Sequence, residues 1–152
     1  MQNTVHGESS PPRLSRKKRK RAARPGSNSV ATISAFRSKY WRQRYSLFSR
    51  YDDGIKMDEE GWFSVTPEAI AAEQAAHAAA HGVPVIIDCF AGVGGNAIQF
   101  AARSFYVVAI EIDPRKVKCA IKNARIYGVE DKIDFVVGDF FRLAPFLKVF
   151  DI

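Results

Sequence analysis

A glycine-rich turn between an apolar strand and a helix restricts what this chain can fold into more than any other feature. Val85–Ile87 is a short run of branched apolar residues typical of a buried strand, and Asn96–Ala102 predicts a helix. Between them the chain reads DCFAGVGGN over residues 88–96. Glycines allow the backbone to approach a ligand that a Cβ atom would repel, and α/β sheets bind nucleotide-containing ligands at such turns. The sequence therefore predicts an α/β domain with a ligand site beside Gly92 and Gly94.

Strands and helices alternate through the rest of the chain. Further strands are predicted at Tyr106–Ile110 and Ile133–Val137, helices at Pro114–Tyr127 and Phe140–Leu147, and the beginning of a fourth strand at Val149–Ile152. Strands that alternate with helices in this way are parallel and are joined by right-handed crossovers. We therefore expect an open, Rossmann-like α/β sheet.

A helical extension is predicted before this domain, over residues 36–82. Aromatic residues at helical spacing predict a helix over Phe36–Phe48, and Tyr51–Gly54 has the composition of a turn. A second helix is predicted to have Thr66 as its N-cap and to end at Gly82.

The N-terminal tail carries the whole excess of positive charge. Residues 1–28 hold eight basic residues and one acidic residue, whereas residues 29–152 hold 15 of each, which excludes a uniformly basic surface for the folded part. Residues 1–35 are rich in Ser, Pro, Arg and Lys, so we expect a disordered tail. Within it, the unbroken basic run Arg16–Arg21 predicts a patch for a nuclear import receptor or RNA. The alternative is a solvated tail that nothing recognises.

Several classes of protein are disfavoured by simple counts. The longest apolar run, Val83–Val93, is interrupted by Asp88 and is shorter than the ~20 residues of a membrane span. The first 30 residues contain no apolar stretch, which argues against a secretory signal. Cys89 and Cys119 lack partners at metal-ligand spacing, which favours a reduced compartment, either cytosol or nucleus. We expect no membrane association and no metal.

An acidic residue follows each predicted strand: Asp88, Glu111 and Asp139. A dinucleotide-binding turn has the pattern G-x-G-x-x-G with no charge beside the pyrophosphate, and this turn departs from that pattern. A carboxylate is favourable beside the ammonium and sulfonium groups of S-adenosylmethionine. Glu111 can bind ribose hydroxyls, and Asp139 can accept from an adenine amine with Phe140 against the base. The acids therefore favour S-adenosylmethionine as the cofactor, with helix caps or loop acids as the alternative.

Several motifs resemble those of the trimethylguanosine synthase family. They read KYW at 39–41, QRY at 43–45, LFSR at 47–50, DDGIK at 52–56, EGWFSVTPE at 60–68, YG at 127–128 and DKI at 131–133, together with the glycine-rich turn. The resemblance extends over residues 36–152. The stretch from Gly61 to Glu68 is far more specific than the glycine-rich turn, which many class I methyltransferases share.

The resemblance implies a class I, Rossmann-like S-adenosylmethionine-dependent methyltransferase fold, truncated at the fourth strand. Residues 83–152 would be the first half of the methyltransferase α/β domain, and residues 36–82 the N-terminal extension of the catalytic domain. The implied enzyme methylates the exocyclic N2 amine of the 7-methylguanosine cap of small nuclear and nucleolar RNAs, giving the 2,2,7-trimethylguanosine cap. The implied location is the nucleus, with the nucleolus and the cytoplasm as further compartments.

The resemblance also implies roles for single residues. Contacts with the cofactor are expected from Phe48, Ser64, Thr66, Asp88, Gly92, Gly94, Glu111, Asp139 and Phe140. The capped RNA would meet Lys39 at its phosphates, and Glu60 and Asn123 at the guanine. The catalytic loop of the family would lie beyond Ile152, so we expect a fragment or short form that is inactive alone. Two alternatives stay open: a non-catalytic form that binds cofactor or RNA, and another class I RNA methyltransferase.

Overall fold

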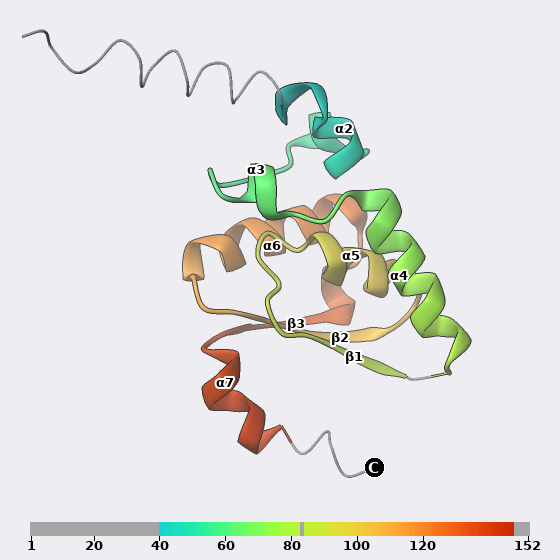
Figure 1. The fold of residues 1–152 in the computed structure, drawn as a ribbon, viewed down its shortest axis with the longest axis vertical. Coiled ribbons are helices and arrows are strands. Elements are labelled where there is room, and N and C mark those ends of the chain that lie inside the picture. Colours follow the sequence, from blue (N-terminus) through green and yellow to red (C-terminus); the bar gives the residue numbers. More distant parts are fainter. Residues whose placement is uncertain (1–39, 83, 148–152) are drawn as a thin grey trace, which may run out of the picture.

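The computed structural model describes residues 40–82 and 84–147 of the chain (Figure 1). Within that part, β1 (Val85–Asp88), β2 (Tyr106–Glu111) and β3 (Ile133–Val137) form a parallel sheet in the order β1-β2-β3. Val85 lies opposite Tyr106, and Val107 lies opposite Ile133. Because the strands are parallel, their carboxyl ends meet at one edge of the sheet. The strands fall within one residue of the predicted bounds, which confirms the predicted α/β architecture.

Helices lie on both sides of this sheet (Figure 1). One side carries α4 (Glu68–Ala80), α5 (Gly95–Ala102) and α6 (Pro114–Tyr127), and the other carries α7 (Phe140–Leu143). The predicted helix over Phe140–Leu147 is divided, because η3 (Ala144–Phe146), a 3-10 helix, replaces its second half. Pro145 accounts for this division, since a proline has no backbone N–H to donate to the carbonyl four residues earlier.

Local capping signals account for α6 fully and for α4 in part. The Asp113 carboxylate accepts from the Arg115 N–H (2.8 Å), and Gly128 closes the helix with φ +70°, as predicted. The predicted start of α4 is wrong by one position: Pro67 and not Thr66 is the N-cap, no side chain caps the helix, and the helix begins at Glu68. Thr66 therefore keeps its hydroxyl available for another role.

Short helices make up the segment before α4. They are α2 (Arg44–Leu47), η1 (Tyr51–Asp53) and α3 (Gly61–Ser64). The predicted helix over Phe36–Phe48 is interrupted at Gln43, the N-cap of α2, whose φ of −93° and ψ of 0° depart from helical geometry. The predicted turn over Tyr51–Gly54 is confirmed, with Gly54 in a left-handed conformation at φ +106°.

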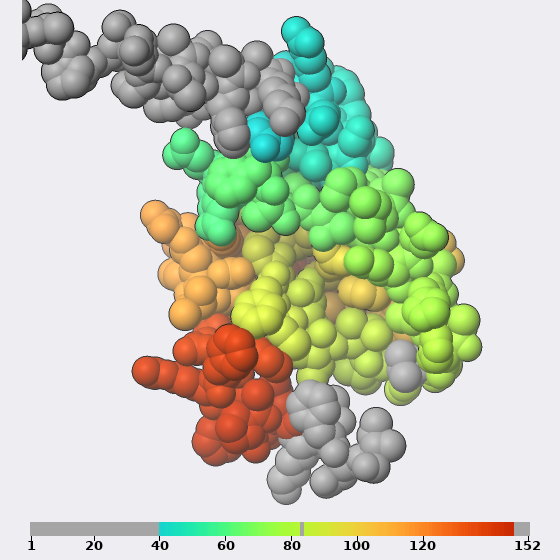
Figure 2. Space-filling view, in the orientation of Figure 1, coloured from blue at the N-terminus to red at the C-terminus, as the bar shows by residue number. Residues whose placement is uncertain are grey.

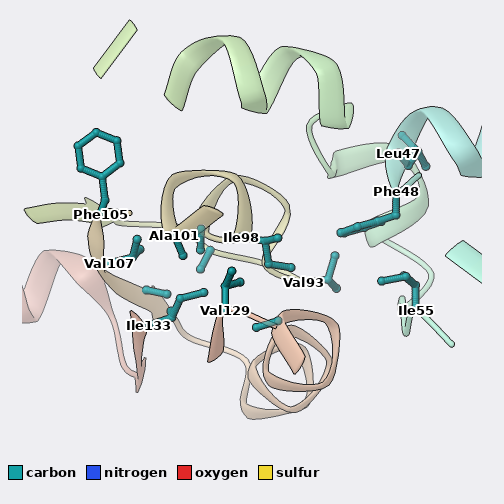
Figure 3. Packing of buried hydrophobic residues seen from close by; sticks show 14 residues of the cluster. Leu47, Phe48, Ile55, Val93, Ile98, Ala101, Phe105, Val107, Val129 and Ile133 are labelled. Atoms are coloured by element: carbon teal, nitrogen blue, oxygen red, sulfur yellow. The ribbon is translucent and has the colours of Figure 1, made fainter. Parts of the chain in front are cut away.

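One hydrophobic core joins the N-terminal segment to the α/β unit (Figure 3). Leu47, Phe48 and Ile55 come from the segment before α4, and Val93 and Ile98 from the glycine-rich turn and α5. Phe48 is only 2% exposed. Burial of apolar side chains stabilises by about 25 cal/mol per Å², so the extension is an integral part of the folded unit.

Several predictions fall outside the described residues: the disordered tail over residues 1–35 with its basic run Arg16–Arg21, the contact of Lys39, and the fourth strand at Val149–Ile152. Over residues 40–82 and 84–147, no helix is long and apolar enough to span a bilayer. In the same ranges, no group of three or more His, Cys, Asp or Glu side chains is arranged to hold a metal ion.

Candidate functional site

A cavity of about 590 Å³ lies where the carboxyl ends of β1 and β2 meet α3 and the first turn of α6. Its lining residues are Glu60, Ser64, Val65, Thr66, Asp88, Phe90, Ala91, Gly92, Val93, Gly95, Asn96, Glu111, Ile112, Asp113 and Lys116. This volume falls within the range of small-molecule sites in proteins. The predicted site residues that the structure brings together here are Glu60, Ser64, Thr66, Asp88, Gly92 and Glu111.

Glu111 forms the floor of the cavity at the end of β2. Its Oε2 accepts from the Gly92 N–H (2.8 Å), and its Oε1 accepts from the Asp113 N–H (2.9 Å). These bonds fix the carboxylate between the glycine-rich turn and the start of α6, with the residue 9% exposed. A carboxylate oxygen has more than one lone pair, so each oxygen can still accept from a ligand hydroxyl.

Asp88 is the carboxylate that the protein satisfies least. Its Oδ1 takes a long bond from the Phe90 N–H (3.4 Å), and its Oδ2 is buried without a hydrogen-bond partner among the described residues. Burial raises the pKa of Asp88 above its ordinary value, against the opposing effect of the backbone N–H groups of Phe90 and Ala97, and the nearby Glu111 carboxylate raises it further. An unpaired buried carboxylate oxygen costs free energy, which a cationic ligand would offset.

The glycines of the turn have different roles. Gly92 lines the cavity at φ +54°, and a Cβ atom there would meet nothing within 4 Å in the described part of the chain. At Gly94 (φ +93°), a Cβ would lie 3.1 Å from the Cβ of Ala120 on α6. Gly94 does not line the cavity. In the structure Gly94 has a packing role between α5 and α6, and its predicted cofactor contact stays a prediction.

The GWFSVTPE stretch builds the wall opposite the glycine-rich turn. Ser64, Val65 and Thr66 lie at the end of α3 and all line the cavity. The Val65 side chain packs against Gly95, where an added Cβ would lie 2.6 Å from Val65 Cγ2. Two hydroxyl groups thus lie on the wall that faces Asp88 and its turn, and either can donate to or accept from a polar ligand.

Lys116 was not identified from the sequence and is the one lysine or arginine among the described residues that line the cavity. It lies in the first turn of α6, and its Nζ donates to Glu60 Oε2 (2.6 Å). Asp58 Oδ2 lies 3.9 Å from the same ammonium. A signal was present, because a lysine in the first turn of a helix is unfavourable to the helix dipole and so indicates a specific partner. Phe90, Asn96, Ile112 and Asp113, which also line the cavity, carried no comparable signal.

Asn123 and Phe48 do not take their predicted positions. Asn123 is fully buried, and its amide is used by the backbone of Lys56 and Val93, so it does not face the cavity. In this structure Asn123 therefore has a structural role, and its predicted contact with guanine stays a prediction. Phe48 lies in the core and against the Tyr127 ring (6.3 Å between centroids), and its predicted contact with the cofactor stays a prediction as well.

Asp139 and Phe140 lie outside the cavity but next to it. Asp139 caps α7 by accepting from the Phe141 N–H (3.0 Å). The Phe140 ring lies 5.7 Å from the ring of Phe90, which lines the cavity and is 67% exposed. In Figure 2, the red α7 segment meets the yellow-green loop that follows β1. A flat apolar group of a ligand could extend from the cavity onto these rings.

The cavity lining is mainly acidic, with one basic side chain and several apolar ones. Carboxylates of Glu60, Asp88, Glu111 and Asp113 surround one lysine. Apolar side chains, Phe90 and Ile112, lie exposed at the rim. Such a lining favours a ligand that carries positive charge, hydroxyl groups and a flat apolar part. S-adenosylmethionine has all three features, and the unpaired oxygen of Asp88 fits its ammonium.

Comparison with known proteins agrees with this chemistry. Residues 83–152 match the model of the family described as RNA cap guanine-N2 methyltransferase. The chain is 48% identical over 103 residues to the trimethylguanosine synthase of Schizosaccharomyces pombe, covering 66% of this chain and 43% of that protein. It is 41% identical over 114 residues to the trimethylguanosine synthase of Saccharomyces cerevisiae, covering 73% of this chain and 36% of that protein. The chain thus spans less than half the length of either relative.

A solved structure supports the fold. A putative O-methyltransferase from Klebsiella pneumoniae superposes with a TM-score of 0.53 at 12% identity, covering 78% of this chain and 54% of that one. At this identity the likeness shows the fold alone. Together with the parallel sheet, it confirms the predicted class I methyltransferase fold.

Proposed function

Because this chain belongs to the RNA cap guanine-N2 methyltransferase family through residues 83–152, we propose that it serves N2 methylation of the 7-methylguanosine RNA cap. The methyl donor is S-adenosylmethionine, whose sulfonium supplies an electrophilic methyl group when bound. The substrates are capped small RNAs of the nuclear and nucleolar classes. The single observation that carries the proposal is that Asp88 Oδ2, at the start of the glycine-rich turn, is buried without a hydrogen-bond partner among the described residues.

Different residues on the cavity wall bind different parts of the cofactor. Asp88 Oδ2 accepts from the cofactor ammonium, since that oxygen has no partner among the described side chains or backbone. Glu111, fixed by two backbone N–H groups, accepts from the ribose hydroxyls. Ser64 and Thr66 close the opposite wall with hydroxyls that reach the polar end of the cofactor. Asp139 and Phe140 extend the adenine side beyond Phe90.

Glu60 is the candidate contact for the cap base. It lies on the cavity lining with its side chain 58% exposed, and a carboxylate can accept from both N–H groups on the amine edge of guanine. Lys39 offers a point charge for the cap phosphates. Catalysis would depend on proximity and orientation, because the enzyme would hold the guanine amine in line with the methyl group of the cofactor.

Calorimetry with S-adenosylmethionine tests the cofactor half of this proposal. Asp88→Asn and Glu111→Gln should each weaken binding by about tenfold or more, because a hydrogen bond to a charged group contributes ~1.5–3 kcal/mol. Asp131→Asn, an exposed acid away from the cavity, is the matched control and should bind as the parent chain does. Unchanged affinity in both cavity variants would refute the assignment of the site.

The basic run Arg16–Arg21 is proposed to direct the chain to the nucleus through an import receptor. Replacing its six residues by Ala, in a fluorescent fusion too large for passive entry, should abolish nuclear accumulation. Replacing Arg37, Lys39 and Arg42 instead removes charge outside the run and should leave accumulation unchanged. An equal nuclear signal from the six-alanine variant would show that the run is a solvated tail.

A further inference from the structure

A buried lysine and an exposed glutamate face each other across the cavity wall. Lys116 Nζ and Glu60 Oε2 lie 2.6 Å apart, and the two residues are 56 positions apart in the chain. The lysine side chain is 14% exposed and the glutamate side chain 58%. The lysine side chain is therefore largely covered, whereas the glutamate side chain is open to solvent on the cavity lining.

The position of Lys116 is unfavourable by itself. It lies in the first turn of α6, where the helix dipole disfavours positive charge. Burial lowers the pKa of Lys116, but the hydrogen bond to Glu60 and the charges of Asp58, Glu60 and Glu111 outweigh burial, so its pKa is raised. The surrounding acids thus hold a charged ammonium in a site that a lysine would otherwise avoid.

We propose that Lys116 is a positioning residue that holds Glu60 in the orientation that binds the guanine base, an inference that rests on the proposed function. The ammonium occupies Oε2 of Glu60 and leaves Oε1 to accept from the amine edge of the base. Without the lysine, an exposed carboxylate beside Asp58 and Asp113 would turn toward solvent. The ligand would then have to order that side chain on binding, and the entropic cost of doing so would weaken the affinity.

A second contact of Lys116 supports a fixed geometry. Asp58 Oδ2 lies 3.9 Å from the ammonium, while Asp58 Oδ1 accepts from the Gly61 N–H (2.9 Å). The start of α3 is thereby tied to the same lysine that holds Glu60. Lys116 therefore connects α6 to the segment that carries Glu60, Ser64 and Thr66.

The test measures binding of 7-methylguanosine 5′-diphosphate to the 152-residue chain by NMR titration, which detects affinities into the millimolar range. Lys116→Met should weaken binding at least fivefold, and Lys116→Arg should restore it to within twofold of the parent chain. Lys118→Met, on the exposed face of the same helix, is the matched control and should change nothing. The amide spectrum of each variant reports whether it is folded.

A double-mutant cycle separates positioning from a general structural effect. Glu60→Gln should weaken binding as Lys116→Met does, and the double variant should bind no more weakly than Glu60→Gln alone. The inference is overturned if Lys116→Met binds as the parent does, or if it weakens binding equally with and without the carboxylate at residue 60. If Lys116→Met is unfolded, Glu60→Gln with parental affinity overturns it as well. A parent chain that shows no saturable binding would overturn this inference for the 152-residue chain, whereas the cofactor titration with Asp88→Asn and Glu111→Gln tests the proposed function separately.

Discussion

Asn123 and Lys56 exchange two hydrogen bonds: the Lys56 N–H donates to Asn123 Oδ1 (2.7 Å), and Asn123 Nδ2 donates to the Lys56 carbonyl (2.9 Å). The same amide nitrogen also donates to the Val93 carbonyl (3.0 Å). One buried side chain of α6 therefore fastens the N-terminal segment and the glycine-rich turn to the same point. The two walls of the cavity are set relative to each other by this amide.

Asn123→Ala should lower the free energy of unfolding by about 2 kcal/mol, because it leaves the part-buried backbone groups of Lys56 and the buried carbonyl of Val93 without their partner. Urea denaturation measures this change. Lys122→Ala, the exposed neighbour on α6, is the matched control and should stay within about 0.5 kcal/mol of the parent. Equal stability of the two variants would contradict the role given to Asn123.

Asp88→Asn should make the ligand-free protein more stable at pH 7 while it weakens S-adenosylmethionine binding. Burial raises the pKa of Asp88 in the folded state, so the folded chain binds this proton more tightly than the unfolded chain does. Stability therefore falls as the pH rises above the ordinary value of 3.8 and the carboxylate ionises. The amide side chain in Asp88→Asn carries no charge, so it removes the free-energy cost of burying an ionised carboxylate.

Thermal unfolding at pH 4 and pH 7 checks this prediction. The melting temperature of Asp88→Asn should exceed that of the parent by more at pH 7 than at pH 4. Asp134→Asn on β3, whose side chain is exposed, provides the comparison and should show no such difference. A lower melting temperature for Asp88→Asn at pH 7 would mean that Asp88 is satisfied within the protein.

Tyr127→Phe should lower stability by about 1 kcal/mol, because it removes the bond from the Tyr127 hydroxyl to Glu68 Oε2 (2.7 Å). Burial and the bond to Glu68 raise the pKa of Tyr127 from 10.0 to about 12. The neutral phenol therefore stabilises the folded state below pH 10, and this contribution is lost as the pH rises toward 12. Denaturation between pH 9 and pH 11 should show a steeper loss in the parent than in Tyr127→Phe, and parallel slopes would contradict the assignment.

Local signals in the sequence predicted most of the fold, and non-local contacts account for what it missed. The bounds of α6 follow from Asp113, Pro114 and Gly128, which act on their own neighbours in the chain. Lys116 and Asn123 have partners 56 and 67 positions away, so no local pattern could identify those partners. The contact of Asn123 with guanine was implied by the family resemblance alone, and the sequence does not show which backbone groups lie opposite that side chain.

The cavity was predicted where acids and glycines mark strand ends, since parallel strands bring those ends to one edge. Asp88 and Glu111 both lie there. The role of Gly94 was predicted less well, because close helix packing and ligand approach both select glycine. Only the position of Ala120, 26 residues further along, separates the two explanations.

Alanine at Gly94 should therefore cost more stability than alanine at Gly92, whereas alanine at Gly92 should cost more cofactor binding. Gly94→Ala combines a left-handed backbone with a Cβ 3.1 Å from that of Ala120, so we expect a loss of about 2–4 kcal/mol in stability. Gly92→Ala has the backbone strain alone, about 1–2 kcal/mol, but places its methyl group on the cavity lining.

Urea denaturation and S-adenosylmethionine titration on both variants separate the loss of stability from the loss of cofactor binding. Gly92→Ala should bind the cofactor more weakly than Gly94→Ala does in its folded fraction, since only the first methyl group lies where the ligand would approach. A Gly94→Ala variant as stable as Gly92→Ala would show that α6 moves away freely, and that the turn at Gly94 is not held by its contact with Ala120.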